Sequence, residues 1–239
     1  LLPLELETVI RKSLLSWETQ TRCHFTVENA GASLRLTAEG FAAHAAHPST
    51  GINAISGLMS ALSELSPENE LARIATFMEH IGFDLTGKGL GIDLTDEISG
   101  RLSFNVGKIE VCDHKVIFSI DNRVPVTYRC AQVQELIQKQ LIGSGFRFEN
   151  PYATESIHVP EDSFLVQTLM ESYRNVTGDM SAKPLVDGAC SYARALDNCV
   201  AFGALLPDQP DLMHQTNECL ELDKLDLWMK IYLDAIYRL

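Results

Sequence analysis

Two pairs of alternating segments limit the folds open to this chain more than any other feature. Residues 22–29, "RCHFTVEN", and 33–40, "SLRLTAEG", alternate apolar and polar side chains as half-buried strands do, and residues 29–31 form a hairpin-like turn between them. Residues 101–111, "RLSFNVGKIEV", and 114–124, "HKVIFSIDNRV", repeat the pattern. We therefore predict two related strand pairs in one α+β domain.

Segments with helical spacing follow both strand pairs. After the first pair, apolar residues recur at helical intervals over residues 54–65, which is typical of a helix packed on a sheet, and Asn53 is its predicted N-cap. Ser66 and Pro67 have the types expected at the start of another helix, which Gly82 would close. The other predicted elements are helices over 4–17 and 129–141, a glycine-rich flexible connector over 83–100 and a strand near 145–150. This order predicts a duplicated two-layer sandwich.

The pattern changes after residue 156. A helix is predicted over 162–177, then a loop "VDGACSYARALDN", a short buried strand "CVAFGAL" at 199–205 and a loop through "DLMHQTNE". Apolar residues at helical spacing from Leu225 to Leu239 predict a closing amphipathic helix. We therefore place a domain boundary near residue 156.

The overall charge excludes two classes of partner. The formal net charge is −13, and no five-residue window is dominated by lysine and arginine. A surface that neutralises phosphates is therefore missing, so we expect neither nucleic acid nor an anionic membrane as a partner. No apolar run reaches the length of a membrane span.

The six cysteines contain no C-x-x-C pair, so neither a zinc ribbon nor a redox motif is indicated. Reduced thiols and the lack of a signal-peptide pattern predict a cytoplasmic protein. The chain begins at Leu1 without an initiator methionine, directly at a helix-like pattern, and we expect it to be a piece of a longer protein.

Several short motifs have both a functional and a structural interpretation. "GKGLG" at 87–91 lacks the strand and helix that a phosphate-binding loop needs, so a connector is favoured. Arg123 lies on the polar face of its predicted strand with Asp121, either as a surface ion pair or as a guanidinium fork for a substrate carboxylate. His214 is a lone loop histidine, and one donor does not make a zinc site.

"GFAAHAAHPSTGINAI", residues 40–55, resembles the lid-domain signature of the di-zinc aminopeptidase, carboxypeptidase and aminoacylase superfamily. Further segments resemble, in order, the C-terminal half of bacterial dipeptidases of the PepV type, namely "GRLSFNVGKIEV", "FSIDNRVPV", "YARALDNCVAFGALLP", "HQTNECLELDKL" and "IYLDAIYRL". The similarity covers essentially the whole chain. It implies a duplicated ferredoxin-like lid over residues 1–156, followed by the C-terminal part of an α/β catalytic domain over 157–239.

The resemblance also assigns roles to single residues. In the family, two zinc ions polarise the scissile carbonyl and activate a bridging water, and a lid imidazole stabilises the oxyanion from the opposite side. The family's lid histidine falls on His44, four residues before Pro48, while His47 occupies a variable, solvent-facing position. Arg123 would bind the C-terminal carboxylate of a dipeptide, and His214 would be a zinc ligand, although one histidine suits Zn, Mn and Co alike.

The loop "DGACSYAR" matches a glycine-rich segment whose backbone amides help to bind the same carboxylate. Ala189, Cys190 and Ser191 stand where the family has Gly, Gly and Thr. Their Cβ atoms restrict the backbone, so we expect these substrate-binding residues to hold a different ligand or to bind it less well.

The family's other zinc ligands belong to an N-terminal segment with a His-x-Asp triplet and a Glu-Glu pair, and residues 1–239 contain neither. We therefore expect that the chain alone does not assemble the two-metal centre and is inactive alone. The expected partner is the missing N-terminal catalytic segment, or a second copy that covers exposed apolar strand edges such as "CVAFGAL".

Two functions follow from these observations. The parent protein is a zinc-dependent dipeptidase, or the chain is a non-catalytic, lid-derived interaction or dimerisation module. Retention of His44, Arg123 and His214 favours the first, whereas the missing ligands and the altered loop favour the second.

Overall fold

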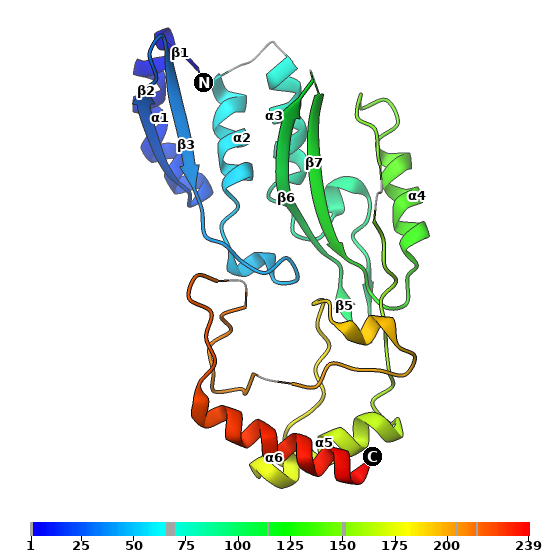
Figure 1. Ribbon diagram of the computed structural model, residues 1–239. Coiled ribbons are helices and arrows are strands. Elements are labelled where there is room, and N and C mark those ends of the chain that lie inside the picture. Colours follow the sequence, from blue (N-terminus) through cyan, green and yellow to red (C-terminus); the bar gives the residue numbers. More distant parts are fainter. Residues whose placement is uncertain (1, 66–69, 114, 150–151, 204, 214) are drawn as a thin grey trace. The chain divides into compact units, whose positions relative to one another are not determined.

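The computed structural model describes residues 2–65, 70–113, 115–149, 152–203, 205–213 and 215–239 (Figure 1). Contacts divide the chain into two compact units, Leu1–Thr154 and Glu155–Leu239. Helices and small antiparallel sheets are mixed in the chain, which confirms the predicted α+β class. Within the described ranges, no helix combines the length and the apolar character needed to cross a membrane.

The first half of the N-terminal unit combines a three-stranded antiparallel sheet with two long helices. In chain order its elements are β1 (Leu2–Pro3), η1 (Leu4–Leu6), α1 (Glu7–Thr21), β2 (His24–Asn29), β3 (Ser33–Glu39), η2 (Pro48–Thr50) and α2 (Ala54–Leu65). Strands β2 and β3 form the predicted hairpin, and β1 pairs with the other edge of β3. Helix α2 begins where the sequence indicates, because the Asn53 side chain accepts a 3.1 Å hydrogen bond from the Ser56 N–H.

The second half repeats the order helix, strand, strand, helix. Its elements are α3 (Glu70–Ile81), η3 (Lys88–Leu90), β4 (Thr95–Asp96), β5 (Gly100–Arg101), β6 (Ser103–Cys112), β7 (Lys115–Arg123) and α4 (Cys130–Gln140). Strands β6 and β7 are antiparallel, with a bulge between Val106 and Lys108. The predicted cap at Ser66 and Pro67 lies outside the described residues.

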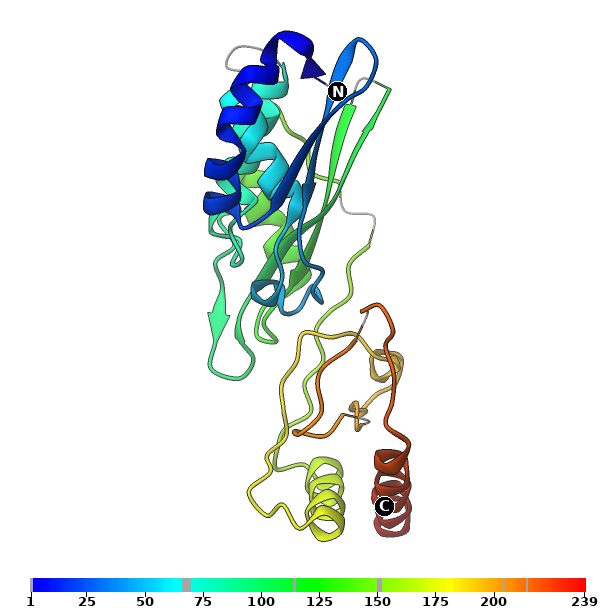
Figure 2. The same cartoon turned by 90° about the vertical axis from the view of Figure 1, so that its left-hand side faces the viewer.

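Two apolar cores lie between the layers of this unit, helices on one side and strands on the other (Figure 2). Helix α2 contributes to both, with Met59 in one core and Ala61 in the other. The alternation predicted for β7 is found, since Phe118 and Ile120 pack on the core that contains Met59, whereas Ile117 is exposed. The stripe of α2 and the alternating strands therefore supply side chains to both cores, together with residues of α1, α3 and α4.

The segment 83–100 is not a flexible connector, and that prediction is wrong. Leu90 is 2% exposed and Ile92 is fully buried, and both belong to the core with Leu102 and Phe104. The Leu85 carbonyl also accepts a 3.0 Å hydrogen bond from the Phe104 N–H. The glycines around these residues permit a compact turn, and the apolar side chains between them anchor it.

The strand predicted near 145–150 is absent from its described part, residues 145–149. Phe146 instead stacks on Phe77 of α3, with ring centroids 3.9 Å apart, and also lies beside Phe118. The segment buries its aromatic side chain against α3 and β7, and its described residues form no strand pairing.

The C-terminal unit contains α5 (Phe164–Thr177), η4 (Tyr192–Ala195) and α6 (Leu222–Arg238). Its small core is centred on Leu206, Trp228 and Ile231. The predicted buried strand "CVAFGAL" is not a strand in its described residues, and Leu205 within it is half exposed. A strand needs a neighbouring strand for its backbone groups, and the described part of this unit contains none.

Candidate functional site

The histidine-containing stretch forms a closed loop between β3 and α2. Phe41 and Ile52 exchange both backbone hydrogen bonds, at 3.0 and 2.9 Å, and so close the loop at its neck. A Cβ at Gly40 would lie 2.0 Å from the Ile52 carbonyl oxygen, and one at Gly51 would lie 2.7 Å from the Ala43 Cβ. The two glycines of the motif therefore serve the close approach of the two loop ends.

His44 is half-buried in this loop, and His47 is exposed. The His44 Nδ1 accepts a 3.3 Å hydrogen bond from the Ala46 N–H, and the His44 carbonyl accepts one from the His47 N–H at 2.9 Å. The two imidazole centroids are 6.1 Å apart. A neutral imidazole whose Nδ1 is an acceptor carries its proton on Nε2, so His44 is set as an Nε2–H donor.

Two side chains fasten this loop to β6, namely Ser103 on the strand itself and Asn53, which follows the loop and faces the strand. The Ser103 hydroxyl donates to the Ala45 carbonyl at 3.3 Å. The Asn53 Nδ2 donates to the Asn105 Oδ1 at 3.0 Å and to the Val106 carbonyl at 2.8 Å. The loop that bears His44 is thus tied to β6 at two points, beside His44 at Ala45 and just beyond its neck at Asn53.

Arg123 ends β7 and forms a two-pronged pair with Asp121. Its Nε lies 2.7 Å from the Asp121 Oδ1, and its Nη2 donates to the Oδ2 at 3.0 Å. The Arg123 side chain is 19% exposed and that of Asp121 is 42% exposed. The surface ion pair that the sequence left open is therefore present, and it holds the guanidinium in place.

The register of β6 and β7 brings these features together. Ser103 lies opposite Arg123, and Asn105 lies opposite Asp121. Directly opposite residues share a face, as do alternate residues of a strand, so all four side chains lie on one polar face of the strand pair. Since Ser103 also binds the loop next to His44, the structure brings His44 and Arg123 into one neighbourhood.

The Asp96 carboxylate holds the segment that follows Arg123. It accepts hydrogen bonds from the N–H and hydroxyl of Ser99 and from the N–H and hydroxyl of Thr127, while the Ser99 hydroxyl accepts one from the Val126 N–H. Desolvation raises the pKa of Asp96, but these hydrogen bonds, led by the one from the Ser99 N–H, outweigh it and lower the pKa to about 2. The β4–β5 hairpin is thereby fixed to the end of β7.

The loop that carries Ala189, Cys190 and Ser191 belongs to the C-terminal unit. The Ala189 N–H donates to the Asp187 side chain at 3.0 Å, and the Ser191 hydroxyl caps η4 by accepting from the Ala193 N–H at 3.3 Å. None of residues 189–191 has a left-handed backbone. The substituted loop is thus organised by short local hydrogen bonds of its own polar side chains.

His214 lies outside the described residues. Within the described ranges, no group of three or more His, Cys, Asp or Glu side chains is close enough to hold a metal ion. The described residues do not by themselves fit a metal centre, so no chemical step is derived through one.

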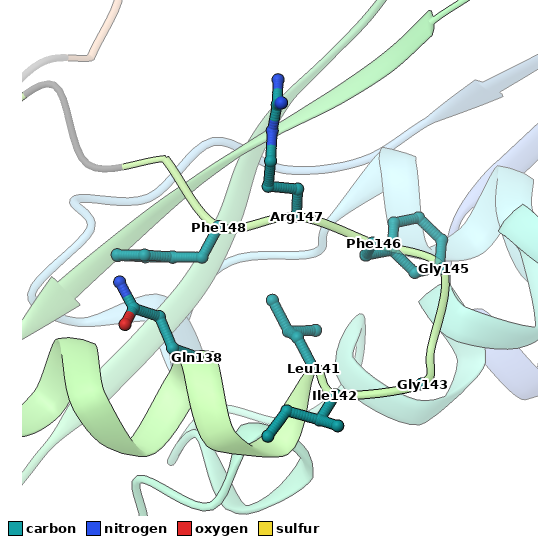
Figure 3. A pocket seen from close by; sticks show the side chains of 8 residues that line it. All are labelled: Gln138, Leu141, Ile142, Gly143, Gly145, Phe146, Arg147 and Phe148. Carbon is teal, nitrogen blue, oxygen red and sulfur yellow. The ribbon is translucent and has the colours of Figure 1, made fainter.

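A shallow depression of about 770 Å³ lies elsewhere in the N-terminal unit, at the end of α4 (Figure 3). It is lined by Gln138, Leu141, Ile142, Gly143, Gly145, Phe146, Arg147 and Phe148. Arg147 pairs with Glu149 at 2.5 Å on the exposed rim. The lining residues are mainly apolar and are separate from the polar face of β6 and β7.

The sequence interpretation missed the roles of Ser103, Asn105 and Asp96. For the first two, a signal was present, because "LSFNV" alternates and sets both polar residues against Phe104 and Val106. Their partners lie more than fifty positions away in the sequence, so the pattern alone could not identify the tethered loop.

Comparisons with known proteins agree with these features. Residues 28–141 match the family model of the peptidase dimerisation domain. A "Putative dipeptidase" of Staphylococcus epidermidis is 34% identical over 208 residues, which are 86% of this chain and 44% of the relative. Proteins with the same description are 33% identical over 208 residues in Staphylococcus aureus strain MW2 and 35% identical over 209 residues in Staphylococcus haemolyticus, with the same coverage.

The chain spans a little under half the length of the curated relatives it matches. The matched family domain includes the tethered loop and both strands of the polar face. These findings confirm the resemblance that the sequence motifs indicated. Residues 28–141 therefore belong to the family of M20 peptidase dimerisation domains.

Proposed function

We propose that this chain supplies the lid side of the substrate site of a metal-dependent dipeptidase. The observation that carries the proposal is the tethering of the His44 loop to the strand opposite Arg123, through the Ser103 hydroxyl. A hydrogen-bond donor and a guanidinium lie in one neighbourhood of a half-buried polar face. A dipeptide presents two matching groups, a scissile carbonyl and a terminal carboxylate.

His44 is proposed as the donor to the oxyanion that develops when the carbonyl is attacked. Its Nδ1 already accepts from the Ala46 N–H, which leaves the proton of the neutral ring on Nε2. A donor that is held in place before the reaction stabilises the transition state without reorganisation. Gly40 and Gly51 close the loop that keeps the imidazole in position.

Arg123 is proposed as the group that binds the terminal carboxylate. A guanidinium has five N–H donors in a planar fork, and Asp121 engages the side formed by Nε and Nη2. A guanidinium fork binds carboxylates with two parallel hydrogen bonds, which is the recognition proposed for the substrate. Asp121 then acts as the support that orients the guanidinium.

The C-terminal unit is proposed to be part of the catalytic domain, with His214 as a metal ligand and residues 189–191 near the substrate carboxylate. Zinc is the proposed metal, with manganese or cobalt as alternatives, and the remaining ligands would come from outside residues 1–239. The similarity of 86% of the chain to proteins described as putative dipeptidases supports this assignment. A cytoplasmic location is part of the same proposal.

A second function is favoured by the family match itself. The matched family is a dimerisation domain, and a self-associating, non-catalytic module would use the same fold. This alternative predicts a dimer that forms equally well in a His44→Ala variant and no hydrolysis of dipeptides by the wild-type protein.

The test is steady-state hydrolysis of dipeptides by the protein produced from its complete gene. His44→Ala should lower kcat by about a hundredfold or more while KM changes little, because an oxyanion donor acts mainly in the transition state. His47→Ala is the matched control, since His47 lies in the same loop but is exposed. Arg123→Lys should instead raise KM, because a point charge replaces a planar fork.

Unchanged kcat in His44→Ala, or equal effects of His44→Ala and His47→Ala, would contradict the assignment. Sedimentation of the same samples measures the oligomeric state and tests the alternative directly.

A further inference from the structure

We propose that Ser103 and Asn105 are positioning residues that set the spacing between His44 and Arg123, and that this spacing selects substrates by the position of their terminal carboxylate. The inference rests on the proposed function, and it adds two residues that would touch no substrate. It is based on the two hydrogen bonds that tie the His44 loop to β6, from Ser103 to the Ala45 carbonyl and from Asn53 to Asn105, which we call the two tethers.

Each tether meets β6 opposite one member of the Arg123–Asp121 pair. Ser103, which donates to the Ala45 carbonyl, lies opposite Arg123. Asn105, which accepts from the Asn53 Nδ2, lies opposite Asp121. The side chains that hold the loop and those that hold the guanidinium are therefore cross-strand neighbours on one face.

The segments that connect His44 to Arg123 through the loop and β6 are held by several hydrogen bonds. The loop is closed at its neck by the two Phe41–Ile52 hydrogen bonds. Asn53 is fixed at three points, by Ser56, Asn105 and the Val106 carbonyl. The opposite face of β6 is anchored in the core, where Phe104 is fully buried. A movement of the loop against Arg123 must therefore break the Ser103 or the Asn105 contact.

A fixed spacing has a chemical consequence for substrates. In a dipeptide with a C-terminal α-amino acid, the carboxylate is one bond closer to the scissile carbonyl than in one with a C-terminal β-amino acid. If Arg123 binds the carboxylate, a rigid loop places His44 correctly for only one of the two. Small errors in the position of a catalytic group cost large factors in rate, so the rigid site should discriminate between them.

The experiment compares alanyl-alanine with its isomer alanyl-β-alanine, using the protein from its complete gene. The variants are Ser103→Ala, Asn105→Ala and the double variant, and Ser103→Thr restores the hydroxyl. Ser119→Ala is the matched control, since Ser119 is an exposed serine on the same face of β7, opposite Lys108. Thermal unfolding of each variant confirms that it is folded.

For the double variant we expect kcat on alanyl-alanine to fall about tenfold with KM within about twofold, because the loosened group acts in the transition state. The ratio of kcat/KM between the two dipeptides should move toward one by about fivefold or more, since the spacing is no longer enforced. Ser103→Thr and Ser119→Ala should match the wild type in that ratio.

An equal loss of kcat/KM on both dipeptides would show that the two residues are merely structural, and wild-type behaviour of the double variant would also overturn the inference. His44→Ala and Arg123→Lys are measured in parallel. If those two variants reduce activity as expected while the double variant does not change the ratio, the positioning inference alone is wrong. If they have no effect, the proposed function fails and this inference fails with it.

Discussion

The two tryptophans of the chain lie in different units, and their surroundings differ. Trp17 in the N-terminal unit is fully buried, and its Nε1 donates to the Glu64 Oε2 at 2.8 Å. Trp228 in the C-terminal unit is 4% exposed, but its Nε1 has no acceptor among the described residues. A buried N–H is costly to leave unpaired. The indole of Trp17 therefore has its hydrogen bond satisfied within its own unit, whereas that of Trp228 does not among the described residues.

The apolar surfaces of the two units show the same contrast. The cores of the N-terminal unit contain side chains from four helices and from both main strand pairs. Helix α6, in contrast, buries one side around Ile231 and exposes large apolar residues at helical spacing on another, namely Leu222, Met229, Leu233 and Ile236. The N-terminal unit thus builds two extensive cores, although it also exposes apolar residues such as Leu15 and Ile142, whereas the C-terminal unit has one small core beside an exposed apolar helix face.

Replacement of Trp17 by alanine should give the largest effect and should sharpen this contrast. It removes a fully buried ring that contacts Phe25, so the free energy of unfolding of the N-terminal unit should fall by about 3–5 kcal/mol. Trp228→Ala is the matched change and should cost less, because it also removes a buried N–H that has no acceptor among the described residues. Urea denaturation, with hydrogen exchange on peptides from β3 and α6, assigns each loss to its unit. Equal losses would break the comparison.

A second pair of variants compares the tightness of backbone packing. Gly40→Ala places a Cβ 2.0 Å from a backbone oxygen at the neck of the His44 loop, and it should cost about 2 kcal/mol or more. Among the described residues, a Cβ at Gly203 in the C-terminal unit would meet the Tyr232 hydroxyl at 3.1 Å, which can move, so Gly203→Ala should cost less than about 1 kcal/mol. Thermal unfolding measures both. A larger loss for Gly203→Ala would contradict the contrast.

The smallest expected effects concern one carboxylate in each unit. Several hydrogen bonds lower the pKa of Asp96 to about 2, whereas Lys224 lowers the pKa of Asp208 through an exposed ion pair at 2.5 Å. A lowered pKa stabilises the fold above the unfolded value, near 3.8, and this stabilisation is lost as pH falls toward 2. The stability difference between wild type and Asp96→Asn should therefore be constant above about pH 5 and shrink between pH 4 and 2.

The salt dependence of stability should distinguish the two carboxylates. About 0.5 M salt screens exposed ion pairs, so the effect of Asp208→Asn should vanish there while that of Asp96→Asn persists. Denaturation curves at two salt concentrations and several pH values give both results. A salt-sensitive Asp96→Asn effect would show that its hydrogen bonds are weaker than the geometry indicates.

The elements of the N-terminal unit could be predicted from the sequence because their side chains alternate or recur with strict periods. That pattern also placed Asp121 and Arg123 on one polar face. The burial of Leu90 and Ile92 could not be predicted, because it depends on Leu102 and on other residues distant in the sequence. The segments 145–149 and 199–203 have strand-like composition, but a strand exists only where another strand pairs with it.

The candidate site follows the same division. His44 and Arg123 were proposed from motifs, and their catalytic and binding roles stay predictions. The link between them depends on Ser103 and Asn105, whose partners are set by the folding of a distant loop onto β6. Local patterns therefore indicate which residues carry polar chemistry, and only the tertiary structure indicates which of them form a unit.

The hydrogen bonds of Asn53 also bear on whether a further strand can pair with β6. An exposed strand edge offers backbone groups to any extended chain that approaches it. On β6 the Val106 carbonyl is occupied by the Asn53 amide, and the Phe104 N–H is occupied by the Leu85 carbonyl. An incoming strand would have to displace both before it could add there. The Asn53 side chain thus caps α2 and also occupies a backbone group on the edge of β6.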